Sequence, residues 1–159
     1  MFQLTSSRYR QNSKKAERTN ELKLQRQIHE GRIRDQLISL GASKSALASE
    51  EAHFLPTLIN TDEQIGGVVY GLHQDGFAML IATSYRVIFL DKKPLFNTVD
   101  DVRYEVISGV SFGHAGIGST VTLHTKIKDY KLRTLNRKCA TGFVKFIESR
   151  CLMGEYKPT

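Results

Sequence analysis

The spacing of apolar residues changes twice along the chain, from helical to alternating and back to helical. Residues 13–40 are rich in Lys, Arg, Glu and Gln, which favour helix, and their apolar positions recur at helical spacing except for a break around Gly31. They predict one weakly amphipathic helix, or two, after a polar segment at residues 1–12 that we expect to be frayed. Residues 65–134 alternate as strands do, and residues 137–151 return to a helical period. The pattern therefore predicts a mainly β domain with helices before and after it.

A short helix precedes the strands. Ser43 is a suitable N-cap for a helix that continues to Phe54, and Pro56 ends it because the residue before a proline avoids the α-helical region. Leu47, Phe54 and Leu58 would share one face of this segment. We expect that face to pack on the strands.

Turn residues divide the middle of the chain into strands with short connections. Asp75-Gly76 is the strongest turn signal, and connections this short make successive strands antiparallel neighbours. The predicted strands are 65–71, 77–83, 85–91, 101–112, 119–124 and 129–134. Their aromatic residues have the spacing of buried barrel residues: Tyr70, Phe77, Tyr85, Phe89 and Phe112. We therefore expect few exposed rings that could stack on nucleic-acid bases.

The last helix carries the clearest apolar stripe of the chain. Its members are Ala140, Phe143, Val144, Ile147 and Cys151. Asn136 is a suitable N-cap for this helix. We expect Phe143 and Ile147 to pack the helix over the open end of a barrel formed by the strands.

Residues 83–92 (Thr-Ser-Tyr-Arg-Val-Ile-Phe-Leu-Asp-Lys) resemble the third strand of bacterial pleckstrin-homology (PH)-like families, including the YokE-like ones. Further residues match a turn and strands of the same families: Leu95 and Phe96, Tyr104, Ile107, Val110 and Phe112, and Gly118 with 121–124. The resemblance covers about residues 60–152. It implies a PH-like bent antiparallel barrel of six or seven strands capped by a C-terminal α-helix. Residues 72–76 contain no Lys or Arg, so the resemblance does not extend to inositol phosphate binding.

The sequence predicts four segments. They are a basic extension at 1–40, helical or partly disordered, a short helix and linker at 41–60, the PH-like domain at 61–152 and a tail at 153–159. The barrel and helix pattern is complete without the extension. We therefore expect deletion of residues 1–40 to leave a folded domain.

Positive charge is concentrated near the N-terminus. Residues 1–40 hold nine Lys or Arg and four Asp or Glu, so they carry +5 of the formal +7. Such an arm can meet an anionic membrane surface, nucleic acid or an acidic partner. Its candidate binding residues are Arg8, Arg10, Lys14, Lys15, Arg18, Lys23 and Arg26.

A second basic group lies around the start of the last helix. Its members are Lys131, Arg133, Arg137 and Lys138. Cations in the first turn of a helix oppose its dipole, and a bound anion would offset that cost. We therefore treat these residues as a candidate anion site and expect Arg133, Arg137 and Lys138 to converge.

Few residues suggest catalysis. There is no Gly-x-Ser-x-Gly elbow, and the five histidines lack metal-ligand spacing, so we predict no catalytic residue, no metal and no cofactor. The glycines of 113–118 lack the Lys-Ser/Thr ending of a phosphate loop and predict a barrel bend. Cys139 and Cys151 would lie roughly 18 Å apart on one helix, too far for a disulfide. Unpaired thiols predict a cytoplasmic protein, one that can lie at the membrane periphery.

Two functions fit these observations. The leading one is a non-catalytic binding module that docks a protein or peptide, and it rests partly on the resemblance. The alternative is reversible attachment to an anionic surface, membrane lipid or nucleic acid, through the basic arm. A further candidate partner is a second copy of the chain, bound by self-association through residues 13–40. Salt should weaken surface attachment steeply and apolar docking little.

Overall fold

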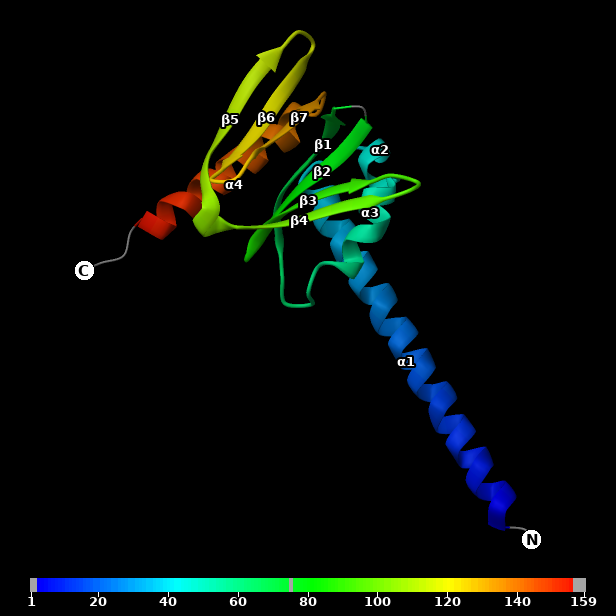
Figure 1. Ribbon diagram of the computed structural model, residues 1–159. Helices are drawn as coiled ribbons and strands as arrows, with labels where there is room; N and C mark the ends of the chain where they lie inside the picture. Colours follow the sequence, from blue (N-terminus) through cyan, green and yellow to red (C-terminus); the bar gives the residue numbers. More distant parts are fainter. Residues whose placement is uncertain (1–2, 75, 156–159) are drawn as a thin grey trace. The chain divides into compact units, whose positions relative to one another are not determined.

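In its described residues the structure, a computed structural model, has one long helix, two short helices, seven strands and a C-terminal helix (Figure 1). It describes residues 3–74 and 76–155, and side chains of 6–74, 76–114 and 116–151. The predicted turn residue Asp75 and most of the predicted tail therefore lie outside the described residues. Within the described part, no helix is long and apolar enough to cross a membrane.

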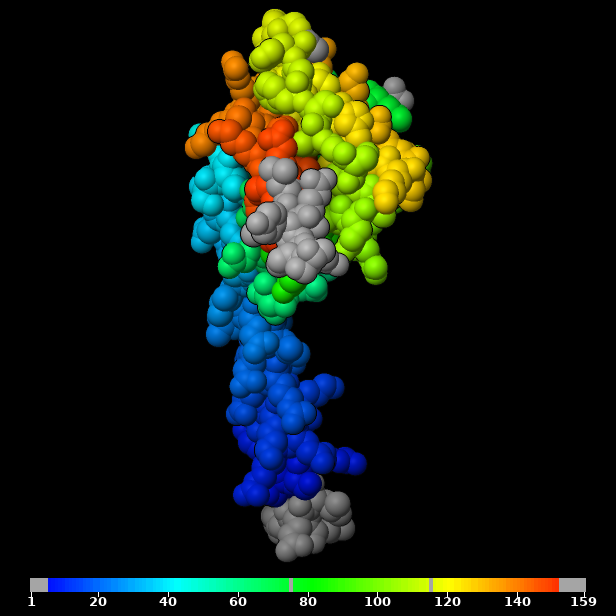
Figure 2. Space-filling model, turned by 90° about the vertical axis from the view of Figure 1, so that its left-hand side faces the viewer, coloured from blue at the N-terminus to red at the C-terminus, as the bar shows by residue number. Residues whose placement is uncertain are grey.

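The chain forms two compact units, residues 1–32 and 33–159. The first consists of the N-terminal part of α1, the helix Gln3–Ser39. All side chains from residue 6 to 28 are exposed, and Figure 2 shows those on the visible face (blue) standing out into solvent. Of the two predicted alternatives, one helix or two, the structure shows one helix that continues through Gly31, because one glycine disfavours a helix by only about 1 kcal/mol and its neighbours are strong helix formers. The expected fraying is also absent from Gln3 onward.

Seven strands follow in the second unit. They are β1 Ile65–His73, β2 Gly76–Thr83, β3 Arg86–Lys92, β4 Asn97–Arg103, β5 Ile107–Ala115, β6 Gly118–Thr125 and β7 Asp129–Thr134. The predicted strand 101–112 is two strands, because a 3-10 turn at Tyr104–Val106 separates β4 from β5. The other predicted strands are confirmed with shifted ends.

The seven strands form one antiparallel sheet that curls into a half-barrel. Their order is β4-β3-β2-β1-β7-β6-β5, so β4 and β5 are the edges. Among the described residues, β1 pairs with β7 only at Leu72 opposite Arg133. A Cβ at Gly71 would lie 2.3 Å from the Arg133 carbonyl oxygen, so this crossing requires glycine at that position. The predicted PH-like architecture is confirmed, and the sheet is open between its edge strands.

The inner face of the sheet holds one hydrophobic core. Phe143 and Ile147 of α4, the helix Arg137–Glu155, are fully buried there in one cluster with Phe89. The helix begins at its predicted N-cap, since the Cys139 N–H donates to Asn136 Oδ1 at 3.1 Å. The predicted packing of α4 on the barrel is therefore confirmed.

The outer face of β1, β2 and β3 holds a second core, larger than the sequence indicated. Its buried members are Ile33, Leu37, Leu55, Ile59, Ile65, Val68, Met79, Ile81, Ile88, Leu90 and Cys139. The end of α1, two short helices and a 3-10 turn cover this face. Leu47, Phe54 and Leu58 pack against the cluster, as predicted.

The predicted helix from Ser43 to Phe54 is in fact two helices, α2 (Lys44–Leu47) and α3 (Glu50–Phe54), followed by the 3-10 turn η1 (Leu55–Thr57). Ser43 caps α2 as predicted, and Ser49 caps α3 by accepting the Ala52 N–H at 3.1 Å. This second cap interrupts the helix because a serine side chain competes for backbone donors.

Deleting residues 1–32 and deleting residues 1–40 should affect stability differently. Ile33 and Leu37 are 1% and 2% exposed, so a chain that begins at residue 41 lacks two core side chains. Losing a buried Leu or Ile side chain destabilises by about 2–5 kcal/mol. We expect a lower urea midpoint for this chain and an unchanged midpoint for one that begins at residue 33. Equal midpoints for both would show that α1 contributes nothing to the core. The predicted boundary at residue 40 stays a prediction.

Candidate functional site

The helical layer on the outer face of the sheet ends before the strands do. Alternation places Val68, Tyr70 and Leu72 of β1 on this face, next to Phe77 of β2. Val68 is buried beneath the helices, whereas Leu72 and Phe77 are 46% and 50% exposed. The uncovered end of the face forms the floor of a groove of about 1000 Å³.

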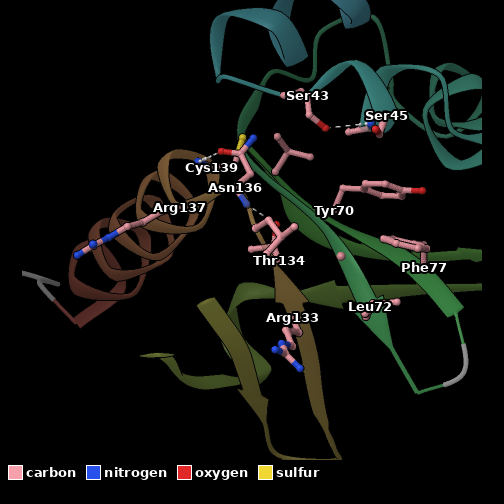
Figure 3. A pocket seen from close by; sticks show the side chains of 15 residues that line it. Ser43, Ser45, Tyr70, Leu72, Phe77, Arg133, Thr134, Asn136, Arg137 and Cys139 are labelled. Carbon is pink, nitrogen blue, oxygen red and sulfur yellow. Dashed lines mark hydrogen bonds between the residues drawn. The ribbon is translucent and has the colours of Figure 1, made fainter. Parts of the chain in front are cut away.

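Three parts of the second unit surround this groove (Figure 3). Strands β1 and β2 form the floor, and Ser43 and Ser45 at the start of α2 form one wall. The link from β7 to α4, residues 133–137, forms the other wall. The groove thus lies where β1 and β7 diverge from their single crossing.

The floor of the groove is aromatic and apolar. The Tyr70 and Phe77 rings stack with centroids 5.2 Å apart, and Leu135 on the opposite wall is 80% exposed. Burial, and secondarily the charge of Glu51, raises the pKa of Tyr70, so its phenol stays a neutral donor at physiological pH. The expectation that the strand aromatics are mostly buried is wrong for Phe77 and for Tyr85, which is 55% exposed. Phe77 lies on the outer face, and Tyr85 lies in the turn between β2 and β3, where its hydroxyl donates to Asp62 at 2.9 Å.

Asn136 caps the start of α4 and links it to the chain before α2. Asn136 accepts the Cys139 N–H and donates through Nδ2 to the Gly41 carbonyl oxygen at 2.8 Å. The Cys139 thiol donates to the Leu40 carbonyl oxygen at 3.3 Å, and burial raises its pKa, opposed by the nearby charge of Lys138. Cys139 is therefore packed, as expected, and its raised pKa disfavours the reactive thiolate.

The structure does not bring the four residues of the predicted anion site together. Lys131 and Arg133 are exposed on the outward face of β7, as their alternation predicts. Arg133 and Arg137 line the groove, but Figure 3 shows their side chains extending in different directions. Lys138 instead packs against Gly41, with Cδ 3.0 Å from the position of a Cβ there. The expected convergence is therefore absent, and anion binding by these residues stays a prediction.

The predicted basic arm lies on the exposed part of α1. Its members, Arg8, Arg10, Lys14, Lys15, Arg18, Lys23 and Arg26, are all exposed. Arg26 Nε lies 3.0 Å from Glu30 Oε1, and both side chains are well exposed. Exposed pairs of this type contribute little to stability, and anion binding by the arm stays a prediction.

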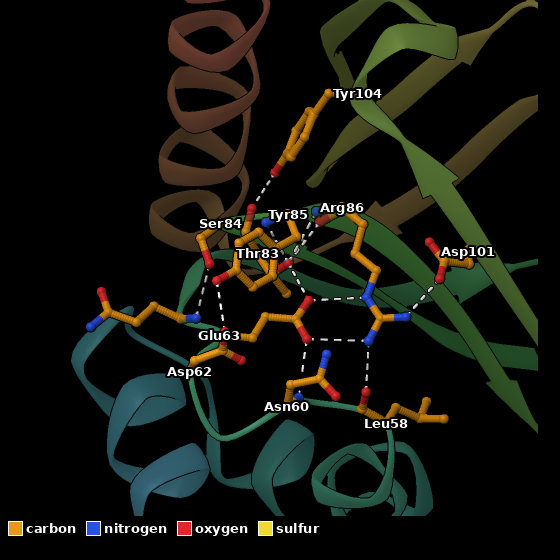
Figure 4. Close-up of polar contacts among 11 residues, drawn as sticks. Leu58, Asn60, Asp62, Glu63, Thr83, Ser84, Tyr85, Arg86, Asp101 and Tyr104 are labelled. Carbon is orange, nitrogen blue, oxygen red and sulfur yellow. Dashed lines mark hydrogen bonds and ion pairs between the residues drawn. The ribbon is translucent and has the colours of Figure 1, made fainter.

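A polar network at the other end of the outer face is centred on Glu63 (Figure 4). Glu63 is fully buried, and its Oε1 accepts Arg86 Nε at 3.0 Å and the Thr83 hydroxyl at 2.6 Å. Arg86 also donates to the Leu58 carbonyl oxygen at 2.7 Å and to Asp101 at 2.6 Å. The network ties the linker before β1 to β2, β3 and β4. Two residues of the recognised motif, Thr83 and Arg86, thus serve the fold.

The network controls the ionisation of its members. Burial alone would raise the pKa of Glu63, but hydrogen bonds from Arg86, Thr83 and the Asn60 N–H, with the charge of Arg86, lower it. The pKa of Arg86 is raised, chiefly by its hydrogen bond to Glu63. Both groups are therefore ionised at neutral pH.

Three residues on the outer face of β5–β7 lie in the order of a catalytic triad. Ser111 Oγ lies 2.5 Å from His124 Nε2, and His124 Nδ1 lies 3.1 Å from Asp129 Oδ1. The three residues show no motif in the sequence, because only the strand register brings them together. The His124 and Asp129 side chains are 37% and 57% exposed, so water reaches the whole arrangement. Triad enzymes also need an oxyanion hole in a site that excludes water. Here Ser111 pairs with Thr122 within the ladder.

No group of three or more His, Cys, Asp or Glu side chains in the described part of the chain is arranged to hold a metal ion.

Stability should fall on acidification through the protonation of Glu63. Its folded pKa is lowered, so its contribution is complete above the ordinary value of 4.5 and is lost as the pH falls through the lowered value. Glu63→Gln should destabilise by about 3–5 kcal/mol at pH 7, because it breaks a buried ion pair. The difference in unfolding free energy between the variant and the wild type should shrink below pH 4.5. Urea unfolding at several pH values measures this, with the exposed Glu148→Gln as control. A gap independent of pH would contradict the proposed ionisation.

Ser111 should not react as an activated nucleophile. We expect a fluorophosphonate probe to leave the full-length chain unlabelled in intact-mass spectrometry, because Ser111 is exposed and water reaches the His124 and Asp129 side chains beside it. A serine protease under the same conditions is the positive control. Labelling at Ser111 that His124→Gln abolishes would show a working triad.

Comparison with known proteins places the chain in a family. The family model described as Bacterial PH domain matches residues 59–149, more than half of the chain. No curated protein matched the sequence. One similar solved structure is a DUF1696 family protein with a pleckstrin-homology domain from Shewanella loihica PV-4. It is 18% identical, with 63% of this chain and 92% of that chain covered and a TM-score of 0.43. PH-like domains are generally binding modules. The family match confirms the predicted resemblance: the chain belongs to the bacterial PH domain family.

Proposed function

We propose that this domain is a non-catalytic binding module that docks a peptide segment of a partner protein in the groove beside β1. The observation that carries this function is the uncovered apolar floor, where Leu72 and Phe77 are about half exposed beside the Tyr70 ring. Contiguous exposed apolar surface next to a concave wall is typical of an interaction site. Covering it would bury side chains that now face water.

The dimensions of the groove favour a peptide. Small-molecule pockets occupy about 300–1000 Å³, so this groove is at the upper end of that range. Its apolar positions are spread over β1, β2 and the opposite wall at Leu135, rather than gathered in one enclosed cavity. An extended peptide can place successive anchors along such a surface.

Selection from a phage-displayed library of random peptides tests this function. We expect the full-length chain to enrich peptides that share apolar anchor positions. Leu72→Glu should weaken the binding of the enriched peptides at least about tenfold, which is roughly 1.4 kcal/mol. Val99→Glu is the matched control, because Val99 is a strand residue of similar exposure, 41%, that does not line the groove. Absence of enrichment, or equal binding to the Leu72 variant, would contradict docking at this groove.

Attachment to an anionic surface is the second candidate function. The observation that favours it is the exposed basic face of residues 6–28 in α1. Proteins that make six to ten phosphate contacts lose about 10³–10⁵ in affinity between 50 and 200 mM salt. Co-sedimentation with phosphatidylcholine vesicles, with and without phosphatidylserine, and binding to a random-sequence DNA duplex distinguish the two surfaces. A chain beginning at residue 33 should lose either interaction.

Self-association through α1 remains a proposal of the same kind. Leu22, Leu24 and Ile28 are 66%, 58% and 63% exposed on this helix. A molecular mass that rises with protein concentration, in the full chain and not in the chain beginning at residue 33, would support it.

A further inference from the structure

We infer that the groove selects an acidic peptide, one that carries a carboxylate close in sequence to an apolar anchor. This inference rests on the proposed docking function and names the chemistry of the partner. Arg133 and Arg137 are the only charged residues among the described residues that line the groove. An apolar groove with charge of one sign at its wall is complementary to an apolar segment of the opposite charge.

Two described residues just outside the groove carry charge of the same sign. Lys131 is exposed on the same face of β7 as Arg133, and Lys44 begins the α2 wall. Glu51 is an acidic group near the floor, since its charge affects Tyr70, but it is 4% exposed and accepts the Lys92 N–H at 3.1 Å. It is therefore engaged by the protein and does not line the groove. The charged residues that line the groove in the described part of the chain are therefore basic.

The start of α4 does not replace the arginines as the acceptor of the carboxylate. A free helix N-terminus would bind an anion through its N–H groups. Here Asn136 accepts the Cys139 N–H, so this terminus is already capped. A guanidinium group offers paired donors that match the two oxygens of a carboxylate. Arg133 and Arg137 extend in different directions (Figure 3), so each would meet a carboxylate separately, and Arg133 would do so from beside Gly116 and Gly118.

The strand register places charge and anchor side by side. Arg133 is directly opposite Leu72 where β7 crosses β1. Residues opposite each other in antiparallel strands lie about 5 Å apart. A peptide with an apolar side chain at Leu72 can therefore reach Arg133 with a carboxylate one or two residues away. The motif is an apolar residue followed or preceded closely by Asp or Glu.

A charge-reversal experiment on the full-length chain tests this selectivity. The probes are two fluorescent pools of short synthetic peptides, one alternating Leu, Ile, Val or Phe with Asp or Glu, the other replacing Asp and Glu by Lys and Arg. Fluorescence anisotropy should show the wild type binding the acidic pool at least about tenfold more tightly, the size of one charge-assisted hydrogen bond. Arg133→Glu combined with Arg137→Glu should reverse the preference.

Two controls keep the result specific to the groove. Lys145→Glu makes the same charge change on an exposed position of α4 outside the groove and should not alter the preference. Binding of the acidic pool to the basic arm would survive the charge reversal and would therefore count against the inference. Thermal melting checks that the variants fold, and Arg133→Gln, which should weaken acidic binding alone, replaces the double variant if that one does not.

The outcomes separate the inference from the function on which it rests. Equal binding of both pools that Leu72→Glu still abolishes would overturn the acidic selectivity and leave docking in place. Binding of neither pool, or binding insensitive to Leu72→Glu, would overturn docking as well.

Discussion

The close crossing of β1 and β7 is the constraint on which the rest of the domain depends. Gly71 lets the Arg133 carbonyl approach where any Cβ would collide with it. Two further glycines on the same strand allow α4 to pack closely against β1. A Cβ at Gly66 would lie 2.1 Å from the Phe146 ring, and one at Gly67 would lie 3.0 Å from Phe143 Cα. The three glycines therefore let both α4 and β7 approach the backbone of this strand closely. Its crossing curls the sheet, and its divergence beyond the crossing leaves the groove.

A sheet with two apolar faces needs a covering on each. The inner face is closed by its own curl and by α4, whereas the outer face depends on the end of α1 and the short helices. The Glu63–Arg86 pair fixes the linker that carries those helices to β3, so the covering is anchored at one end of the face. At the other end, it stops before Leu72 and Phe77. The candidate site is thus the part of the outer face that the helical layer leaves uncovered.

Much of the fold could be predicted from the sequence because it depends on local periodicity. The strands, the N-caps at Ser43 and Asn136, and the stripe of α4 each follow from spacing within a few residues. The second core could not be read in the same way, because alternation shows that a strand has two faces without showing what covers them. One signal was present: Phe77–Ala82 is continuously apolar, which is typical of a strand buried on both sides.

The site was harder to predict because its residues are far apart in the sequence and are brought together only by the pairing of the strands. Leu72 and Arg133 are far apart in the sequence, and only the crossing makes them opposite. Ser111, His124 and Asp129 were missed for the same reason. Arg133 and Arg137 were recognised as basic candidates, but their apolar surroundings were not. Conversely, Thr83 and Arg86 looked informative as a family motif and hold the linker in place.

The arginines in the groove change how the two candidate functions can be told apart. Salt dependence was expected to separate apolar docking from attachment to an anionic surface. A groove that also uses Arg133 and Arg137 gives docking a salt dependence of its own, because charges at an exposed wall are screened within about 8 Å at physiological ionic strength. Screening acts equally on an arm and on a wall of the same sign. Burial of Leu72 and Phe77 is insensitive to screening, so the apolar floor, not the charge, is the feature that distinguishes docking from surface attachment.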